Sequence, residues 1–195
     1  MAREKRAAYV GEEYWGRPLP GFGDPQARVY VLGLAPAAHG GNRTGRIFTG
    51  DRSGDFLFAA LHRAGFASQP TSERRGDGLE LRDAFIAAAV RCAPPANRPL
   101  TSERENCLPY AAEELAVLPS ARVVLCLGGF AWDAAARLVE FRPRPRFGHG
   151  AEARAPDGRA LLGCFHPSQQ NTFTGRLTPT MMDDVLRRAR ELAAG

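Results

Sequence analysis

Lysine is almost absent from this chain of 195 residues. Lys5 is the only one, and the other 25 of the 26 basic residues are arginines. Enzymes that act through an amine Schiff base usually take the amine from lysine, so only one residue is a candidate for such chemistry. The glycine-rich loop described below contains no lysine, which argues against the phosphoryl transfer typical of a P-loop.

Long apolar runs are also missing. No stretch approaches the ~20 residues that span a bilayer. The charged start, Met1 to Arg6, is not followed by the apolar segment of a signal peptide. We therefore expect a cytoplasmic protein that does not bind membranes. In that compartment its four cysteines, Cys92, Cys107, Cys126 and Cys164, are expected to be reduced or metal-bound and not paired in disulfides.

The remaining composition is that of one folded domain. The length suits a single compact unit, and 44% apolar residues suffice for a sizeable core. The formal charge of +5 suits a polyanionic partner, although many soluble proteins share it. We find no internal repeat and predict a single domain over 1–195. Residues 1–27 read as a polar lead that Trp15 and Phe22 attach to the core.

Apolar runs alternate with amphipathic ones along the chain. Strands are predicted at 28–35, 85–90, 123–128 and 160–165, and helices at 54–64, 102–117, 130–140 and from 179 onward. The alanine-rich second strand could equally be helical. The alternation predicts an α/β fold, a three-layer sandwich with a four-stranded parallel sheet between helices.

Capping residues mark where these helices begin and end. Ser53 and Thr178 are the predicted N-caps of the first and last helices, and Gly65 is the predicted C′ residue of the first. Ser102 and Glu105 have the spacing of a capping box.

The stretch 33–54 has the most unusual composition. It holds six glycines, three arginines, Phe48 and the carboxylate of Asp51, a mixture that packing a core does not require. Parallel α/β sheets bind ligands beyond the carboxyl ends of their strands. The loops 33–54, 93–99 and 166–178 each follow a predicted strand, so we expect them to meet there. The sequence therefore predicts that this edge of the sheet binds a nucleotide and catalyses a reaction on it.

Each candidate site residue at this edge also has a purely structural interpretation. Asp51, beside a helix start, is more often a cap than a general base. Phe48 either stacks on a base or tucks beneath the loop. Asn97 either serves its turn or hydrogen-bonds a base edge. A lone histidine is usually structural, but His166, at a strand end before a polar loop, can donate a hydrogen bond to a developing anion. The polar loop that follows either contacts phosphates or is an ordinary solvated loop.

Three motifs together resemble the family 5 (type B) uracil-DNA glycosylases. They are Gly33-Leu34-Ala35-Pro36-Ala37, the run Asn42 to Gly54, and the run His166 to Thr178. The resemblance extends from near Val10 to the C-terminus. It implies the uracil-DNA glycosylase fold. It also implies hydrolysis of the N-glycosidic bond of uracil in single- or double-stranded DNA, leaving an abasic site for base excision repair.

The resemblance also assigns roles to individual residues. It places the water-activating carboxylate at Asp51 and the leaving-group stabiliser at His166. It makes Phe48 the ring that stacks on the flipped base and Asn97 the amide that contacts it. The base pocket falls on Ala35, Pro36 and Ala37, and the DNA contacts fall on Arg46, Ser168, Gln170, Asn171 and Arg176.

Two departures from related glycosylases concern specificity and metal. Ala37 or its neighbour replaces a polar water-binding residue, and Ala88 replaces a base-reading asparagine, so we expect hypoxanthine and xanthine to be accepted as well. The family holds a 4Fe-4S cluster through four cysteines, of which Cys92 and Cys107 match two. The other two lie in an upstream Cys-x-x-Cys segment that this sequence lacks. The resemblance thus implies either an incomplete cluster or a chain that begins late.

The single lysine also bears on the expected reaction, and two alternative functions stay open. Because Lys5 lies outside every motif, we predict a monofunctional glycosylase. We also expect a monomer, and we expect the bond cleavage to need no metal. One alternative is a non-catalytic module that binds damaged DNA. Another is a nucleoside hydrolase on a similar sheet, which would not explain the polar loop after His166.

Overall fold

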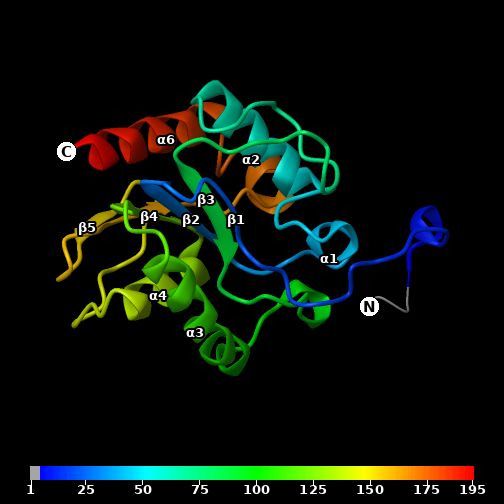
Figure 1. The fold of residues 1–195 in the computed structure, drawn as a ribbon, viewed down its shortest axis with the longest axis horizontal. Helices are drawn as coiled ribbons and strands as arrows, with labels where there is room; N and C mark the ends of the chain where they lie inside the picture. Colours follow the sequence, from blue (N-terminus) through cyan, green and yellow to red (C-terminus); the bar gives the residue numbers. More distant parts are fainter. Residues whose placement is uncertain (1–4) are drawn as a thin grey trace.

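The computed structural model describes residues 5–195, which form an α/β sandwich (Figure 1). Its strands are β1 Phe22–Gly23, β2 Val29–Gly33, β3 Ala84–Ala88, β4 Val123–Leu127, β5 Glu152–Arg154 and β6 Ala160–Cys164. Its helices are α1 Gly41–Thr44, α2 Arg52–Arg63, α3 Thr101–Ala116, α4 Gly129–Leu138, α5 Gln169–Phe173 and α6 Pro179–Ala194, with 3-10 turns η1 Ala7–Tyr9 and η2 Pro95–Asn97.

The predicted parallel sheet is confirmed. The six strands lie in the order β1-β3-β2-β4-β6-β5, and the four central ones are parallel. The edge strands β1 and β5 are antiparallel to their neighbours and were not predicted. They span only two and three residues, too short for an alternating pattern to be recognised. The alanine-rich segment is the strand β3 because it lies between β1 and β2.

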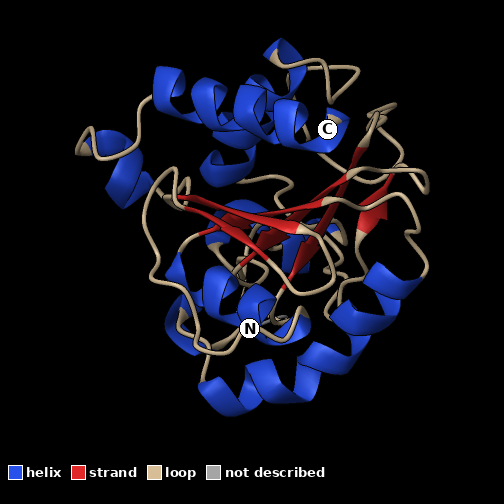
Figure 2. Cartoon of the chain, turned by 90° about the vertical axis from the view of Figure 1, so that its left-hand side faces the viewer, coloured by secondary structure: helices blue, strands red, loops and turns tan. Residues whose placement is uncertain are grey.

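Alternate side chains of the strands face two separate helical layers, and Figure 2 shows the sheet between them. On β2, Val29 and Val31 belong to the core that packs against α2 and α6. Tyr30 and Leu32 belong to the opposite core, which packs against α4 and the end of α3. Because both faces are covered, the central strands are apolar throughout and not alternating.

Two of the predicted helix starts were wrong. Helix α2 begins two residues earlier than predicted because Asp51, and not Ser53, is its N-cap. The predicted capping box between Ser102 and Glu105 does not form. Helix α3 begins at Thr101, and the Glu103 side chain accepts the Leu100 backbone N–H at 2.7 Å instead. The N-cap Leu100 has no side-chain oxygen, so the capping-box pattern could not identify this start.

The other predicted caps are confirmed. The Thr178 side chain accepts from the Met181 backbone N–H at the start of α6. Gly65 follows α2 with φ +76°, and its N–H donates to the His62 carbonyl at 2.9 Å. A positive φ is readily adopted by glycine, so this helix ends where the sequence indicates.

Residues 5–16, here called the N-terminal strap, lie along α1. The Trp15 backbone N–H donates to the Arg43 carbonyl and that of Gly16 to the Asn42 carbonyl, both at 3.1 Å. Trp15 and Phe22 pack against the α2–α6 core, as predicted. Within residues 5–195, no helix combines the length and apolar character needed to cross a membrane.

Candidate active site

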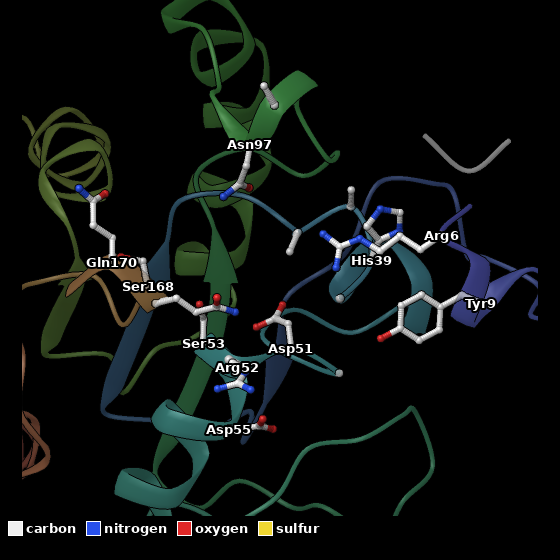
Figure 3. A pocket seen from close by; sticks show the side chains of 16 residues that line it. Arg6, Tyr9, His39, Asp51, Arg52, Ser53, Asp55, Asn97, Ser168 and Gln170 are labelled. Carbon is white, nitrogen blue, oxygen red and sulfur yellow. The ribbon is translucent and has the colours of Figure 1, made fainter. Parts of the chain in front are cut away.

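The three loops predicted to meet do so at the carboxyl edge of the sheet. They surround a cavity of about 750 Å³. Its walls come from the loop before α2, from η2, and from the segment after β6, together with two residues of the N-terminal strap (Figure 3). The lining includes five predicted site residues, Ala37, Asp51, Asn97, Ser168 and Gln170.

Asp51 is both a helix cap and a wall of this cavity. Its Oδ1 accepts the Gly54 backbone N–H at 3.0 Å, so the structural interpretation of this residue is correct. Burial raises the pKa of the Asp51 carboxyl, and the backbone hydrogen bonds from Gly54 and Ser53 oppose that rise only in part. A carboxylate with a raised pKa that faces a cavity is a suitable proton acceptor as well as a cap.

Two glycines make room for the Asp51 loop. A Cβ on Gly40 would overlap the Asp51 carboxylate, and one on Gly54 would overlap the Phe48 carbonyl oxygen. Phe48 itself has φ +52°, an uncommon conformation for a residue with a side chain. The glycines of this loop therefore fix the position of the carboxylate through close packing.

Phe48 is tucked beneath the loop, the second of its two predicted arrangements. Only 6% of the residue is exposed. The ring lies against Gly33, where a Cβ would come within 2.6 Å of it. Its centroid is 5.9 Å from that of the His166 ring, on the next loop. Phe48 thus joins the ends of β2 and β6, and stacking on a base stays a prediction.

His166 follows β6 and is held through its backbone. The Asn171 side chain donates to the His166 carbonyl at 2.8 Å. Burial lowers the pKa of the His166 imidazole to about 4, so the ring is neutral at pH 7. One residue earlier, the Phe165 backbone N–H donates to His149 Nδ1 at 3.2 Å, which fixes the end of the strand. A neutral, oriented imidazole can donate a hydrogen bond to an anion.

Asn97 occupies a strained turn at the top of the cavity in Figure 3. Both Asn97 and Ala96 have positive φ, +56° and +50°. Asparagine tolerates this conformation better than most residues, which agrees with the turn role considered above. Its side chain is also aimed at the cavity, so the two roles are compatible.

Arg46, predicted above to contact DNA, points into the protein in this structure. Its guanidinium is buried and forms an ion pair with Asp77 at 2.6 Å. It also donates to the Ser72 and Thr49 hydroxyls, at 2.8 and 3.0 Å. Local sequence could not reveal this, because the partner carboxylate lies 31 positions away.

The other predicted DNA contacts are accessible to different degrees. Gln170 and Arg176 are exposed, and the Arg176 guanidinium lies 4.7 Å from the Phe165 ring centroid. The Ser168 hydroxyl caps the short helix α5 by accepting from the Asn171 N–H. Pro36 is buried and Ala35 is half-buried behind the cavity wall.

The four cysteines divide into two pairs. Cys126 and Cys164 are buried core residues, as expected from their strands. Burial raises the pKa of the Cys92 thiol, and the nearby Cys107 thiol raises it further. Over residues 5–195, no three cysteine, histidine or carboxylate side chains gather as a metal site would require.

Among the lining residues that sequence reasoning did not assign to the site, three are notable: His39, Arg6 and Tyr9. His39 lies within the glycine-rich loop, so its place there was a signal that could have been used. Arg6 and Tyr9 come from the N-terminal strap, where no local pattern indicated a site. Tyr9 and His39 stack with ring centroids 6.2 Å apart, and the Tyr14 hydroxyl lies 2.8 Å from His39 Nδ1.

Comparison with known proteins agrees with this geometry. The family model described as the uracil DNA glycosylase superfamily matches residues 20–190. The chain belongs to this superfamily. The match covers all four parallel strands and every loop that surrounds the cavity except the N-terminal strap, so the fold and family expected from the motifs are confirmed.

Relatives place the chain beside the type-5 glycosylases. A Type-5 uracil-DNA glycosylase of Mycobacterium bovis is 56% identical over 196 residues, 99% of this chain and 73% of that protein. The Type-5 enzyme of Thermus thermophilus is 50% identical over 97% of this chain and 86% of its own length. A Type-4 uracil-DNA glycosylase of Pyrobaculum aerophilum is 35% identical over 57% of this chain and 50% of its own length.

Proposed function

We propose that this protein is a DNA glycosylase that hydrolyses the N-glycosidic bond of uracil in DNA and leaves an abasic site. The observation that carries the proposal is the position of Asp51. A half-buried carboxylate with a raised pKa faces the cavity where the loops after β2, β3 and β6 meet. The names of the type-5 relatives support the same reaction.

The chemistry separates opposite charges. Bond cleavage leaves a cationic, oxocarbenium-like sugar and an anionic base. Asp51 stabilises the cation and orients the attacking water, accepting its proton as the new C–O bond forms. His166 is neutral and donates a hydrogen bond to the departing anion, a role that a neutral imidazole performs without prior protonation.

The base must leave the duplex before this reaction. Flipping a nucleotide costs a few kcal/mol of stacking and pairing. We assign Ala35, Pro36 and Ala37 to the sugar and base pocket, with Phe48 beneath the base and Asn97 at its edge. Ser168, Gln170, Asn171 and Arg176 are assigned to the DNA backbone, because their segment borders the cavity.

A matched pair of carboxylates tests the proposal. Asp55 lines the same cavity in the first turn of α2, but it is exposed and caps nothing. Asp51→Asn should lower the single-turnover excision rate on a uracil duplex by about 100-fold or more, and Asp55→Asn by only a few-fold. An Asp51→Asn rate near that of the wild-type protein would remove the assigned role.

The same assay separates the rival functions. A damage-binding module would retain the uracil duplex without releasing base, and a nucleoside hydrolase would release uracil from free deoxyuridine. We expect base release from DNA and none from the nucleoside.

We also infer that the enzyme accepts hypoxanthine and xanthine. Ala88 is the last residue of β3 and pairs with Gly33 at the end of β2, the edge of the sheet where the loops of the site begin. An alanine there supplies no amide to discriminate uracil from a purine lesion. Excision of uracil alone from a panel of duplexes would contradict this inference.

The product should be an intact strand with an abasic site. The Lys5 amine donates to the Glu12 carbonyl and lies 5.6 Å from the Tyr14 ring centroid. Lys5 does not belong to the cavity lining. We therefore expect no Schiff base with the sugar, and a borohydride-trapped adduct would disprove this expectation.

A 4Fe-4S cluster fits these residues only in part. Such a cluster takes four thiolates, and Cys92 and Cys107 are the pair that could supply two of them. Cys126 and Cys164 are buried in strands and do not complete the set. The proposed reaction uses Asp51 and His166 and no cluster. Absorbance of the purified protein near 400 nm tests whether a cluster is bound. The monomeric state and the cytoplasmic location stay predictions of the sequence.

A further inference from the structure

The N-terminal strap lies outside the match to the family model, which begins at residue 20, yet it forms part of the cavity. Arg6 and Tyr9 are the two strap residues in the lining. Figure 3 shows their side chains reaching toward the cavity from the side opposite Ser168 and Gln170. Asp51 lies between these two sides.

The strap is attached firmly to the segment between β2 and α2, which contains α1 and ends at Asp51. Besides the two backbone hydrogen bonds to α1, Glu12 forms an ion pair with Arg43 at 2.6 Å. The Arg43 guanidinium lies 4.3 Å from the centroid of the Tyr9 ring, and its Nε donates to the His39 carbonyl at 2.7 Å. Arg43 therefore links the strap to the loop that ends at Asp51, and the Tyr9 backbone N–H donates to the Arg6 carbonyl at 2.8 Å, which joins Arg6 to this attached part of the strap.

Arg6 is a charged residue without a carboxylate partner among residues 5–195. It is exposed, and it forms no ion pair with any residue that the structure describes. Arg43 and Arg46 are engaged in ion pairs. Arg52, the other arginine of the lining, instead has its guanidinium 5.6 Å from the Phe173 ring centroid. A guanidinium that projects into a cleft offers a planar fork of donors, which matches the oxygens of a phosphate.

We propose that Arg6 contacts a backbone phosphate of the damaged strand beside the flipped nucleotide. The strap is then a wall of the DNA cleft, facing the wall formed by Ser168 and Gln170. The inference rests on the proposed function in that DNA is the substrate. It adds a contact that neither the motifs nor the family model includes.

The salt dependence of binding tests this contact. The probe is a DNA duplex with one 2′-fluorinated deoxyuridine, which resists hydrolysis. Each phosphate contact contributes about 0.9 to the slope of log affinity against log salt concentration. Arg6→Gln should lower the slope by about that amount, and Arg6→Lys should restore most of it. Arg17→Gln is the control, because Arg17 is exposed next to the strap and its guanidinium lies 5.8 Å from the Trp15 ring, outside the cavity.

Each outcome decides the proposal. An unchanged slope for Arg6→Gln, or an equal decrease for Arg17→Gln, would overturn it. A decreased slope with an unchanged excision rate at saturating enzyme would support a binding contact, whereas loss of that rate with an unchanged slope would also overturn it. Absence of uracil excision by the wild-type protein would refute the proposed function separately, and the slopes would still decide the role of Arg6.

Discussion

The low pKa of His166 predicts a loss of stability in mild acid. An unperturbed histidine has a pKa near 6.5, and burial lowers that of His166 to about 4. The unfolded chain therefore binds a proton at a pH where the folded protein does not. The resulting stability is fully present above about pH 6.5 and is lost as the pH falls toward 4.

The magnitude follows from the two values. For one group with pKa 6.5 unfolded and about 4 folded, the free energy of unfolding decreases by about 2 kcal/mol between pH 7 and pH 5. Other titrating groups also contribute, including His149, whose pKa burial likewise lowers. A variant that changes only His166 isolates its share, because the other groups are common to both proteins.

Urea unfolding of the wild-type protein and of His166→Gln at pH 7 and pH 5 measures this share. We expect the wild-type protein to lose about 2 kcal/mol more than the variant between the two pH values. His62→Gln serves as a control, because His62 is exposed on α2. Equal losses for the wild-type protein and His166→Gln would refute the reasoning, as would an NMR titration of His166 with a midpoint near 6.5.

Further predictions concern the loops around Asp51. Asp77→Ala leaves the buried Arg46 guanidinium without its carboxylate and should lower the free energy of unfolding by about 3 to 5 kcal/mol in urea titrations; a loss under about 1 kcal/mol would contradict the importance of this pair. Gly40→Ala should displace the Asp51 carboxylate and slow single-turnover excision by on the order of 100-fold with an unchanged circular dichroism spectrum. Activity equal to that of the wild-type protein would show that the loop adjusts. Gly54→Ala should destabilise the fold by about 1 to 3 kcal/mol, because its methyl group meets the Phe48 carbonyl oxygen, and an unchanged unfolding midpoint would contradict that packing.

Local patterns predicted those parts of the fold that depend on neighbours along the chain. The central strands are continuous apolar runs because both faces of the sheet are covered. Gly65 ends α2 because glycine readily adopts its positive φ. The order of these elements placed three loops at one edge of the sheet, and with them Asp51, Asn97 and Ser168.

Ambiguous local signals accounted for the errors at the helix starts. Asp51 and Ser53 are both good N-caps, and the carboxylate of Asp51 is the group that reaches the Gly54 N–H. The edge strands β1 and β5 exist because a neighbouring strand offers its hydrogen bonds, a condition that no window of two or three residues can reveal.

The sequence by itself determined the parallel sheet, the loops that carry the chemistry and the family, because these depend on periodicity and on motifs of adjacent residues. Only the tertiary structure decided which charges are available to a ligand. The Arg46 guanidinium forms an ion pair with Asp77, 31 positions away. Arg6 lines the cavity because the strap is attached to α1. Whether an arginine is buried with a partner or faces a ligand depends on contacts between distant segments, and no local pattern records those.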